Sequence, residues 1–176
     1  DISEKILTEA RKRLPNAQLI THDVRTEGLP YEAGSMNAAI AVNAVVYCPD
    51  HMLKAIHNSL KDNGETVVNF RDFNNPHNKP FYEYYLNDDG KIYDQILSVG
   101  DQEFILKVLD YRDCKDEKIR NLDRQVYFQG KEDIERFIKT MGFQIIGYKQ
   151  FNFKSPVTPD NQIDVYTMKK KVMFSN

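Results

Sequence analysis

Glycine is scarce in this sequence and never clustered. The 176 residues include eight glycines, the first of which is Gly28, and no G-x-G motif occurs. A glycine cluster at the end of a strand lets the backbone approach a ligand closely, because glycine has no side chain in the way. None of the eight glycines supplies such a loop.

Motifs for hydrolysis and for metal binding are also absent. The four histidines lack a metal-binding spacing such as H-E-x-x-H, and there is no G-x-S-x-G motif that would present a nucleophilic serine. Cys48 and Cys114 form no C-x-x-C motif, and two thiols this far apart are typical of reduced residues in a cytoplasmic protein. The sequence therefore predicts no metal site and gives little support to a hydrolase.

Neither an excess of charge nor a long apolar run is present. With 24 Lys+Arg and 26 Asp+Glu the formal net charge is −2, so no basic field could hold nucleic acid or an acidic membrane. The longest apolar run, residues 38–46, contains Asn43 and is too short to span a bilayer. The first residues lack the basic and apolar regions of a signal peptide. We expect a cytoplasmic protein without nucleic-acid or membrane partners.

Helical and extended patterns alternate over the first 70 residues. One amphipathic helix is capped by Ser3 and ended by Pro15, and a second is capped by Asp50 and closed by Asn63-Gly64. The other apolar runs are typical of strands, one of them of the buried parallel type, and they cover residues 17–21, 38–42 and 66–70. This alternation predicts an α/β fold with a parallel sheet covered by helices.

The pattern changes after Arg71. A polar segment rich in Asn and Tyr reaches Gly90, and three strand-like stretches follow, at residues 92–98, 104–112 and 125–127. We interpret residues 72–128 as an insertion or substrate-side lid within a single domain, residues 1–176. The closing elements are a helix at 131–141 and two strands at 144–153 and 163–169, which we expect to form an antiparallel pair.

Several short motifs follow one another along the first 70 residues with a distinctive spacing. They are Asp1-Ile2-Ser3 before a helix, His22-Asp23-Val24 after a strand, Gly28-Leu29-Pro30 and Gly34-Ser35-Met36-Asn37 before an apolar strand, the run from Ala41 to Asp50, and Leu60 to Glu65. This series resembles the class I, Rossmann-like S-adenosylmethionine-dependent methyltransferases. The resemblance is close over residues 1–70 and loose over 132–169, and it implies parallel strands that end in an antiparallel pair.

The resemblance also implies a set of cofactor-binding residues at the carboxyl ends of the strands. They are Asp1, Ile2, Asp23, Val24, Asn43 and Ala44. Asp1 would accept hydrogen bonds from the ribose hydroxyls, and its neighbour would pack on the adenine face. Asp23 would accept from the adenine amine and Val24 would donate its N–H to the ring, while the last two residues would face the methionine part of the cofactor. Taken alone, Asp23 could equally be a capping residue.

The substrate side is less defined. Tyr47 would face the substrate pocket, although it could instead pack in the core. Methyl transfer needs alignment of donor and acceptor above all, so no catalytic residue is assigned; where a hydroxyl acceptor needs a base, the candidates are Tyr47 and Tyr82. The aromatic residues between Phe73 and Tyr85 could cover a substrate or form a packed cluster under a long loop.

One part of the family pattern is absent. The first strand and helix of the domain, with the glycine-rich loop between them, would stand before Asp1. We therefore expect the sequence to be N-terminally truncated, with about 40–60 further residues upstream in the natural protein, the length of a βαβ opening.

These observations favour one function over two others. The leading hypothesis is an enzyme, an S-adenosylmethionine-dependent methyltransferase that acts on a small-molecule acceptor. A non-catalytic module that keeps the fold as a binding or scaffolding surface is the alternative. A nicotinamide-dependent oxidoreductase also binds ribose through an acidic residue, but the series Asp23-Val24 and Asn43-Ala44 argues against it.

Overall fold

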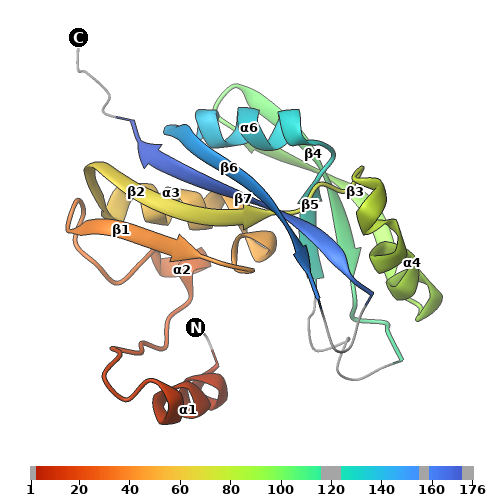
Figure 1. The fold of residues 1–176 in the computed structure, drawn as a ribbon, viewed down its shortest axis with the longest axis horizontal. Coiled ribbons are helices and arrows are strands. Elements are labelled where there is room, and N and C mark those ends of the chain that lie inside the picture. The colour runs from red at the N-terminus through yellow and green to blue at the C-terminus, as the bar shows by residue number, and fades with distance from the viewer. Residues whose placement is uncertain (1–2, 116–123, 155–158, 172–176) are drawn as a thin grey trace.

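The computed structural model describes residues 3–115, 124–154 and 159–171, which form two β-sheets with helices packed around them (Figure 1). The helices are α1 (Glu4–Arg13), α2 (Val24–Glu27), α3 (Pro49–Ser59), α4 (Lys79–Asn87) and α6 (Lys131–Thr140), with 3-10 turns η1 (Val45–Tyr47) and η2 (Pro76–Asn78). The strands are β1 (Met36–Ala41), β2 (Leu60–Phe70), β3 (Lys91–Val99), β4 (Gln102–Asp110), β5 (Arg124–Phe128), β6 (Phe143–Phe153) and β7 (Asn161–Lys170). The predicted α/β class is confirmed.

The larger sheet is mixed. Its four strands lie in the order β1-β2-β7-β6, with β1 parallel to β2 and the other pairs antiparallel. The sequence predicts both the parallel pair and the antiparallel pair that closes the chain, and the structure confirms them. Because β1 and β2 run in the same direction, their carboxyl ends lie at one edge of the sheet, where the residues that follow both strands are brought together.

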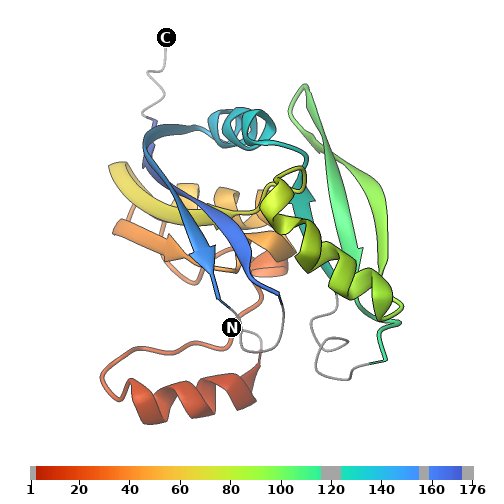
Figure 2. The ribbon, with the colours of Figure 1, turned by 45° about the vertical axis from the view of Figure 1, so that its right-hand side comes forward.

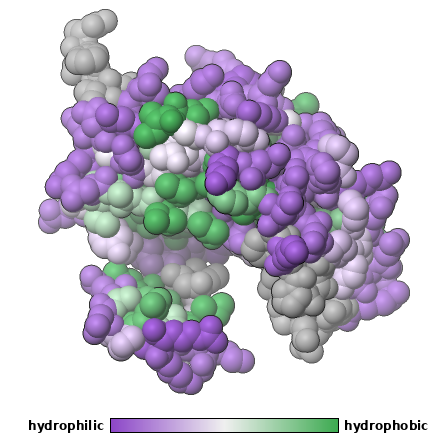
Figure 3. Space-filling view, in the orientation of Figure 1, coloured by the Kyte–Doolittle hydropathy of each residue, from purple (hydrophilic) through white to green (hydrophobic). Residues whose placement is uncertain are grey.

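β1 forms one margin of this sheet. In the described part of the chain β1 pairs with β2 alone, and Ile40 in β1 is 76% exposed. Phe151 in β6, at the other margin, is 43% exposed. Figure 3 shows hydrophobic side chains gathered on the sheet face that is turned to the viewer. Several apolar residues of this sheet are therefore open to solvent.

The second sheet is antiparallel, in the order β3-β4-β5, and α4 lies beside it (Figure 2). The three strands confirm the strand-like stretches expected between residues 92 and 127. The sequence analysis assigned no helix to the segment that forms α4. The helix forms because Pro80 is tolerated in its first turn and because Phe81, Tyr82 and Tyr85 are buried on one side of it. The polar residues around this segment made it look like a loop in the sequence.

One hydrophobic core joins the two sheets through α6. Phe137 of α6 contacts Phe70 of β2, Phe104 of β4 and Phe128 of β5, with ring centroids 6.4, 5.3 and 4.8 Å away. Leu53 of α3 belongs to the same core. Residues of the segment 72–128 are thus packed into the core that the mixed sheet also uses.

Two predictions for the first 70 residues, a strand at 17–21 and a helix closed by Asn63-Gly64, are wrong. Residues 17–21 form no strand, because in the described part of the chain no neighbouring strand offers them a hydrogen-bond ladder, and Leu19 and Ile20 stay half-exposed. The turn at Asn63-Gly64 does not close a helix. α3 already ends at Ser59, where Leu60 becomes extended, and both turn residues lie within β2.

Gly142 provides a test of the connection between α6 and β6. Its φ is +83°, and a Cβ built at this position would lie 2.8 Å from Nε2 of His57. His57 itself stacks edge-on against Phe143, with ring centroids 5.2 Å apart. We therefore expect Gly142→Ala to lower the free energy of unfolding by about 1–3 kcal/mol, since alanine both strains the backbone and displaces the histidine.

Chemical denaturation of the wild type and of Gly142→Ala measures this difference. Gly130→Ala is the matched control, because a Cβ there would meet no atom within 4 Å. An equal change in both variants would contradict the assignment of the effect to His57 and to the left-handed backbone.

Candidate functional site

The loops after β1 and β2 meet at the carboxyl edge of the mixed sheet. Asn43, Ala44 and Tyr47 follow β1, and Arg71 follows β2. Val45 and Val46 between them are buried, which anchors the first loop in the core. Ligands of open α/β sheets bind outside this edge. Three of the residues predicted for the site are therefore neighbours at the expected place.

A pair of asparagines holds the first loop to the end of β2. The backbone N–H of Asn43 donates to Oδ1 of Asn69 at 2.6 Å, and Nδ2 of Asn69 donates to Oδ1 of Asn43 at 3.1 Å. Asn69 is completely buried, and Asn43 has a left-handed backbone with φ 54°. This backbone conformation is unusual for a residue other than glycine, and the reciprocal hydrogen bonds stabilise it.

Tyr47 is connected to the interior by a second set of hydrogen bonds. Its hydroxyl accepts a hydrogen bond from Nε2 of Gln125 at 3.1 Å, and Oε1 of Gln125 accepts from the hydroxyl of Tyr127 and from Nη1 of Arg71. Gln125, Tyr127 and Arg71 are buried, whereas Tyr47 is 44% exposed. Tyr47 is thus held in place at its hydroxyl while part of the side chain faces solvent, and its place at a substrate pocket stays a prediction.

Asp23 and Val24 lie at the start of the short helix α2. The carboxylate of Asp23 caps this helix by accepting from the backbone N–H of Arg25 at 3.0 Å. It also accepts hydrogen bonds from the guanidinium of Arg25. The side-chain hydrogen bond from Arg25 is the main reason why the pKa of Asp23 is lowered to about 2. The helix that Asp23 caps packs against α3, which follows the loop after β1. The capping role considered from the sequence is therefore real, and the residue lies near the loop after β1.

The other tyrosine candidate lies in a different environment. Tyr82 is 4% exposed, stacks on Phe73 with centroids 4.4 Å apart, and donates its hydroxyl to the carbonyl oxygen of Asp72. Burial raises its pKa well above the usual value. Phe81 and Tyr85 belong to the same buried cluster. Of the two interpretations of these aromatic residues, the packed cluster is the one that the structure contains.

Two of the predicted cofactor-binding residues, Asp1 and Ile2, lie outside the described residues. Other residues of the site were not predicted from the sequence. Asn69 and Gln125 were missed, as was the role of Arg71. A polar residue inside the apolar run 66–70 was the available signal for Asn69, since a buried amide needs hydrogen-bond partners.

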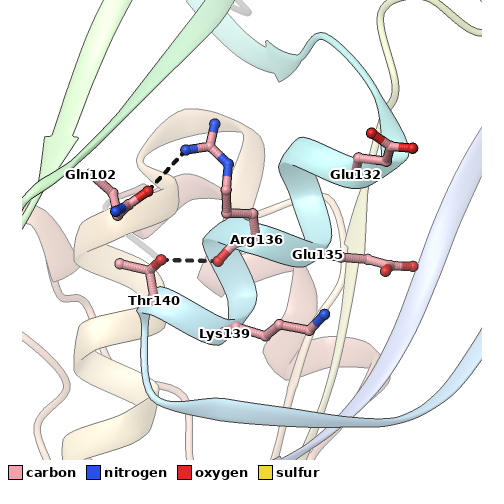
Figure 4. Close-up of a pocket in the computed structure, with 6 residues that line it drawn as sticks. All are labelled: Gln102, Glu132, Glu135, Arg136, Lys139 and Thr140. Carbon is pink, nitrogen blue, oxygen red and sulfur yellow. Dashed lines mark hydrogen bonds between the residues drawn. The ribbon is translucent and has the colours of Figure 1, made fainter.

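A shallow hollow elsewhere on the surface is lined by polar side chains of α6 and by Gln102. Its lining residues are Gln102, Glu132, Glu135, Arg136, Lys139 and Thr140. Figure 4 shows Arg136 reaching Gln102, and the hydroxyl of Thr140 donating to the carbonyl oxygen of Arg136. The hollow is open and contains none of the residues at the carboxyl edge, so we do not assign it to the site.

Two further searches of the described residues concern metals and membranes. Within residues 3–115, 124–154 and 159–171, no group of three or more His, Cys, Asp or Glu side chains could hold a metal ion. Over the same residues, no helix combines the length and apolar character that crossing a membrane requires.

Comparisons with known proteins match the chain both in sequence and in structure. Residues 1–68 match a family model described as a methyltransferase domain. No curated protein sequence gives a significant match. Among solved structures, an S-adenosylmethionine-dependent methyltransferase from Methanosarcina mazei is 15% identical, with a TM-score of 0.61 over 98% of this chain and 81% of that one.

Two more solved structures have the same architecture. An S-adenosylmethionine-dependent methyltransferase from Thermotoga maritima, described as a possible histamine N-methyltransferase, is 19% identical with a TM-score of 0.60, over 97% of this chain and 71% of that one. The 1,6-didemethyltoxoflavin-N1-methyltransferase of Burkholderia thailandensis, solved with its substrate and S-adenosylhomocysteine, is 10% identical with a TM-score of 0.58, over 98% of this chain and 60% of that one.

These matches confirm the resemblance and the fold class predicted from the sequence. The family match covers the segment in which the motifs were found, and the structural matches extend over nearly the whole chain. The chain therefore has the Rossmann-like fold of the S-adenosylmethionine-dependent methyltransferases, and its first 68 residues match their methyltransferase domain.

Proposed function

We propose that this protein is an S-adenosylmethionine-dependent methyltransferase that acts on a small molecule at the carboxyl edge of the mixed sheet. The observation that carries the proposal is the loop after β1, which Asn69 fixes through Asn43 at the edge where this fold binds ligands. The family match and the structural neighbours support the reaction and the cofactor, and the neighbour from Burkholderia thailandensis contains a small-molecule substrate together with S-adenosylhomocysteine.

The residues present fit the cofactor at two places. The loop of Asn43 and Ala44 offers a half-buried, hydrogen-bonded backbone and an amide side chain for the amino-acid part of the cofactor. Asp23 retains acceptor capacity beside Arg25, because a carboxylate has about four lone-pair sites, and so it could accept from the adenine amine. The N–H of Val24 is in the first turn of α2, where N–H groups lack partners within the helix.

The chemistry of the protein itself would be alignment. S-adenosylmethionine supplies an activated methyl group when it is bound, so the chain has to orient the acceptor and exclude water. Tyr47 is the better of the two tyrosine candidates for this task, because its hydroxyl is fixed by Gln125 and its side chain reaches solvent. Tyr82 is buried and its hydroxyl donates to the backbone carbonyl of Asp72, so we do not propose that it contacts the acceptor.

Asp23→Ala tests the cofactor site. We expect the variant to bind S-adenosylmethionine about tenfold or more weakly, because a charge-assisted hydrogen bond to the adenine amine is lost. Isothermal titration calorimetry on the folded protein measures the dissociation constants. Asp133→Ala is the matched control, since Asp133 is also an aspartate near the start of a helix that forms an ion pair with an arginine of that helix, but on α6.

Two outcomes would count against the proposal. Equal affinity of wild type and Asp23→Ala would remove Asp23 from the cofactor site. Failure of the folded wild type to bind the cofactor at all would contradict the enzyme, and the non-catalytic binding module would then be the better interpretation.

A further inference from the structure

We propose that the methyl acceptor carries an oxyanion, a carboxylate or a phosphate, and that Arg71 binds it. The inference rests on the proposed function, because it names the class of substrate that the same site would take. It is based on the surroundings of Arg71, the first residue after β2.

Arg71 is a buried cation with few hydrogen bonds. Arg71 is 7% exposed. Its Nη1 donates to Oε1 of Gln125 at 3.5 Å and to the hydroxyl of Tyr127 at 3.4 Å. Both distances are at the long end of the range for hydrogen bonds. Nε is buried and has no hydrogen-bond partner. The guanidinium also lies over the rings of Phe81 and Tyr127, with its carbon 4.9 and 6.0 Å from their centroids.

No carboxylate neutralises this cation within the described residues. The adjacent carboxylate of Asp72 accepts from the N–H of Asn74, and neighbouring residues of an extended chain point to opposite sides. Burial raises the pKa of Asp72, and the negative charge of Asp164 adds to this.

Several other arginines of the chain form ion pairs with carboxylates. The guanidinium of each pairs with a carboxylate near the surface, and the pairs are Arg11 with Glu4, Arg25 with Asp23, Arg112 with Asp110, and Arg136 with Asp133. Arg71 is more buried than these and lacks such a partner among the described residues. A buried charge costs free energy unless it is paired, so the unused Nε–H of Arg71 leaves a place for a partner outside the described residues, and we assign that place to a ligand.

The position of Arg71 places that partner beside the proposed acceptor site. Gln125 links Arg71 directly to the hydroxyl of Tyr47. Asn69, two residues earlier on the same side of β2, holds the loop of Asn43. An oxyanion could accept from Nε–H and from an adjacent N–H of the guanidinium in parallel, which is the geometry that arginine offers to carboxylates and phosphates. The rest of the acceptor would then lie toward Tyr47 and the cofactor loop.

Phosphate titration of the wild-type protein, followed by NMR of the arginine side chains, tests the inference without turnover. The Nε–H signal of Arg71 is assigned as the one that Arg71→Lys removes. We expect inorganic phosphate to shift this signal in a saturable manner, whereas sodium chloride at the same ionic strength does not. If Arg71→Lys fails to fold, the same signal can be assigned in the wild type through its scalar couplings along the Arg71 side chain, and the titration itself uses the wild type.

Variants then locate the binding. Arg71→Gln is expected to weaken phosphate binding about tenfold or more, since it removes the charge and the paired donors. Arg136→Gln is the matched control, because Arg136 also donates to a glutamine and lies over a phenylalanine ring, but is exposed and paired with Asp133. Absence of a saturable shift at the Nε–H of Arg71, or equal loss in both variants, would overturn the inference.

The outcome is separable from that of the proposed function. A protein that binds S-adenosylmethionine but shows no phosphate shift at Arg71 would remain a methyltransferase candidate with a different class of acceptor. A protein that binds phosphate through Arg71 but does not bind the cofactor would contradict the proposed function and with it the assignment of the anion as part of a methyl acceptor.

Discussion

Phe137→Ala is expected to lower the free energy of unfolding by about 3–5 kcal/mol, the largest effect of any single change considered for this chain. Phe137 is fully buried and contacts aromatic rings from both sheets, on β2, β4 and β5. Alanine would leave a cavity where three elements converge, and the surrounding rings come from rigid strands that cannot easily move inward.

Urea denaturation followed by circular dichroism measures this effect. The control is Phe151→Ala, which removes the same side chain from a position 43% exposed on β6 and is expected to cost less than about 1 kcal/mol. Because Phe137 joins both sheets, we also expect one cooperative transition in the wild type. Two separate transitions, with only one moved by Phe137→Ala, would show that the sheets do not share a single core.

Asn69→Ala is expected to have the second largest effect, and it acts on binding as well as on stability. The change removes the acceptor for the N–H of Asn43 and the donor to its side chain. Leaving such groups unpaired next to a buried site costs about 1–3 kcal/mol. The loop after β1 would lose its left-handed conformation, so we expect S-adenosylmethionine to bind about tenfold or more weakly.

Two companion variants separate the causes. Asn43→Gly keeps the backbone N–H that Asn69 holds and tolerates the φ of 54°, so it isolates the contribution of the Asn43 side chain. Asn152→Ala removes an exposed asparagine whose side chain is hydrogen-bonded to Gln162, and it should change neither property much. Calorimetry at a temperature where all variants are folded gives the affinities. Wild-type affinity in folded Asn69→Ala would show that the cofactor does not depend on this loop.

The sequence predicted much of the fold because the patterns there are local. Three helices, near Ser3, Asp50 and Lys131, are indicated by apolar residues at helical spacing, and the structure contains all three. Ser3 caps the first as predicted, but the prediction that Asp50 caps the second is wrong, because Cys48 is at the N-cap and Asp50 lies in the first turn. The closing strands β6 and β7 are likewise visible as apolar runs. In the site, Asn43, Ala44 and Tyr47 could be placed together because they directly follow a strand, and the end of a strand is where ligands bind in this class of fold.

The misses have physical causes of a different kind. α4 is stabilised by burial of Phe81, Tyr82 and Tyr85 against the second sheet, a tertiary contact that outweighs the loop-like composition around it. Residues 17–21 have a strand-like composition but no strand to pair with in the described residues. The contact between Arg71 and Gln125 joins positions 54 residues apart, so no local pattern could indicate it.

The outer side of β1, at the margin of the mixed sheet, offers backbone hydrogen-bonding groups to a further strand. β1 reads Met-Asn-Ala-Ala-Ile-Ala, without a charge, a proline or a bulky polar residue that would repel another strand. Within the described residues, the side of β1 that faces away from β2 has no strand hydrogen-bonded to it. Natural proteins protect such margins with lysines, prolines or bulges, because an unprotected one acts as a template for strands of other molecules. A further strand, from another part of the natural protein or from another molecule, could therefore extend the mixed sheet at β1.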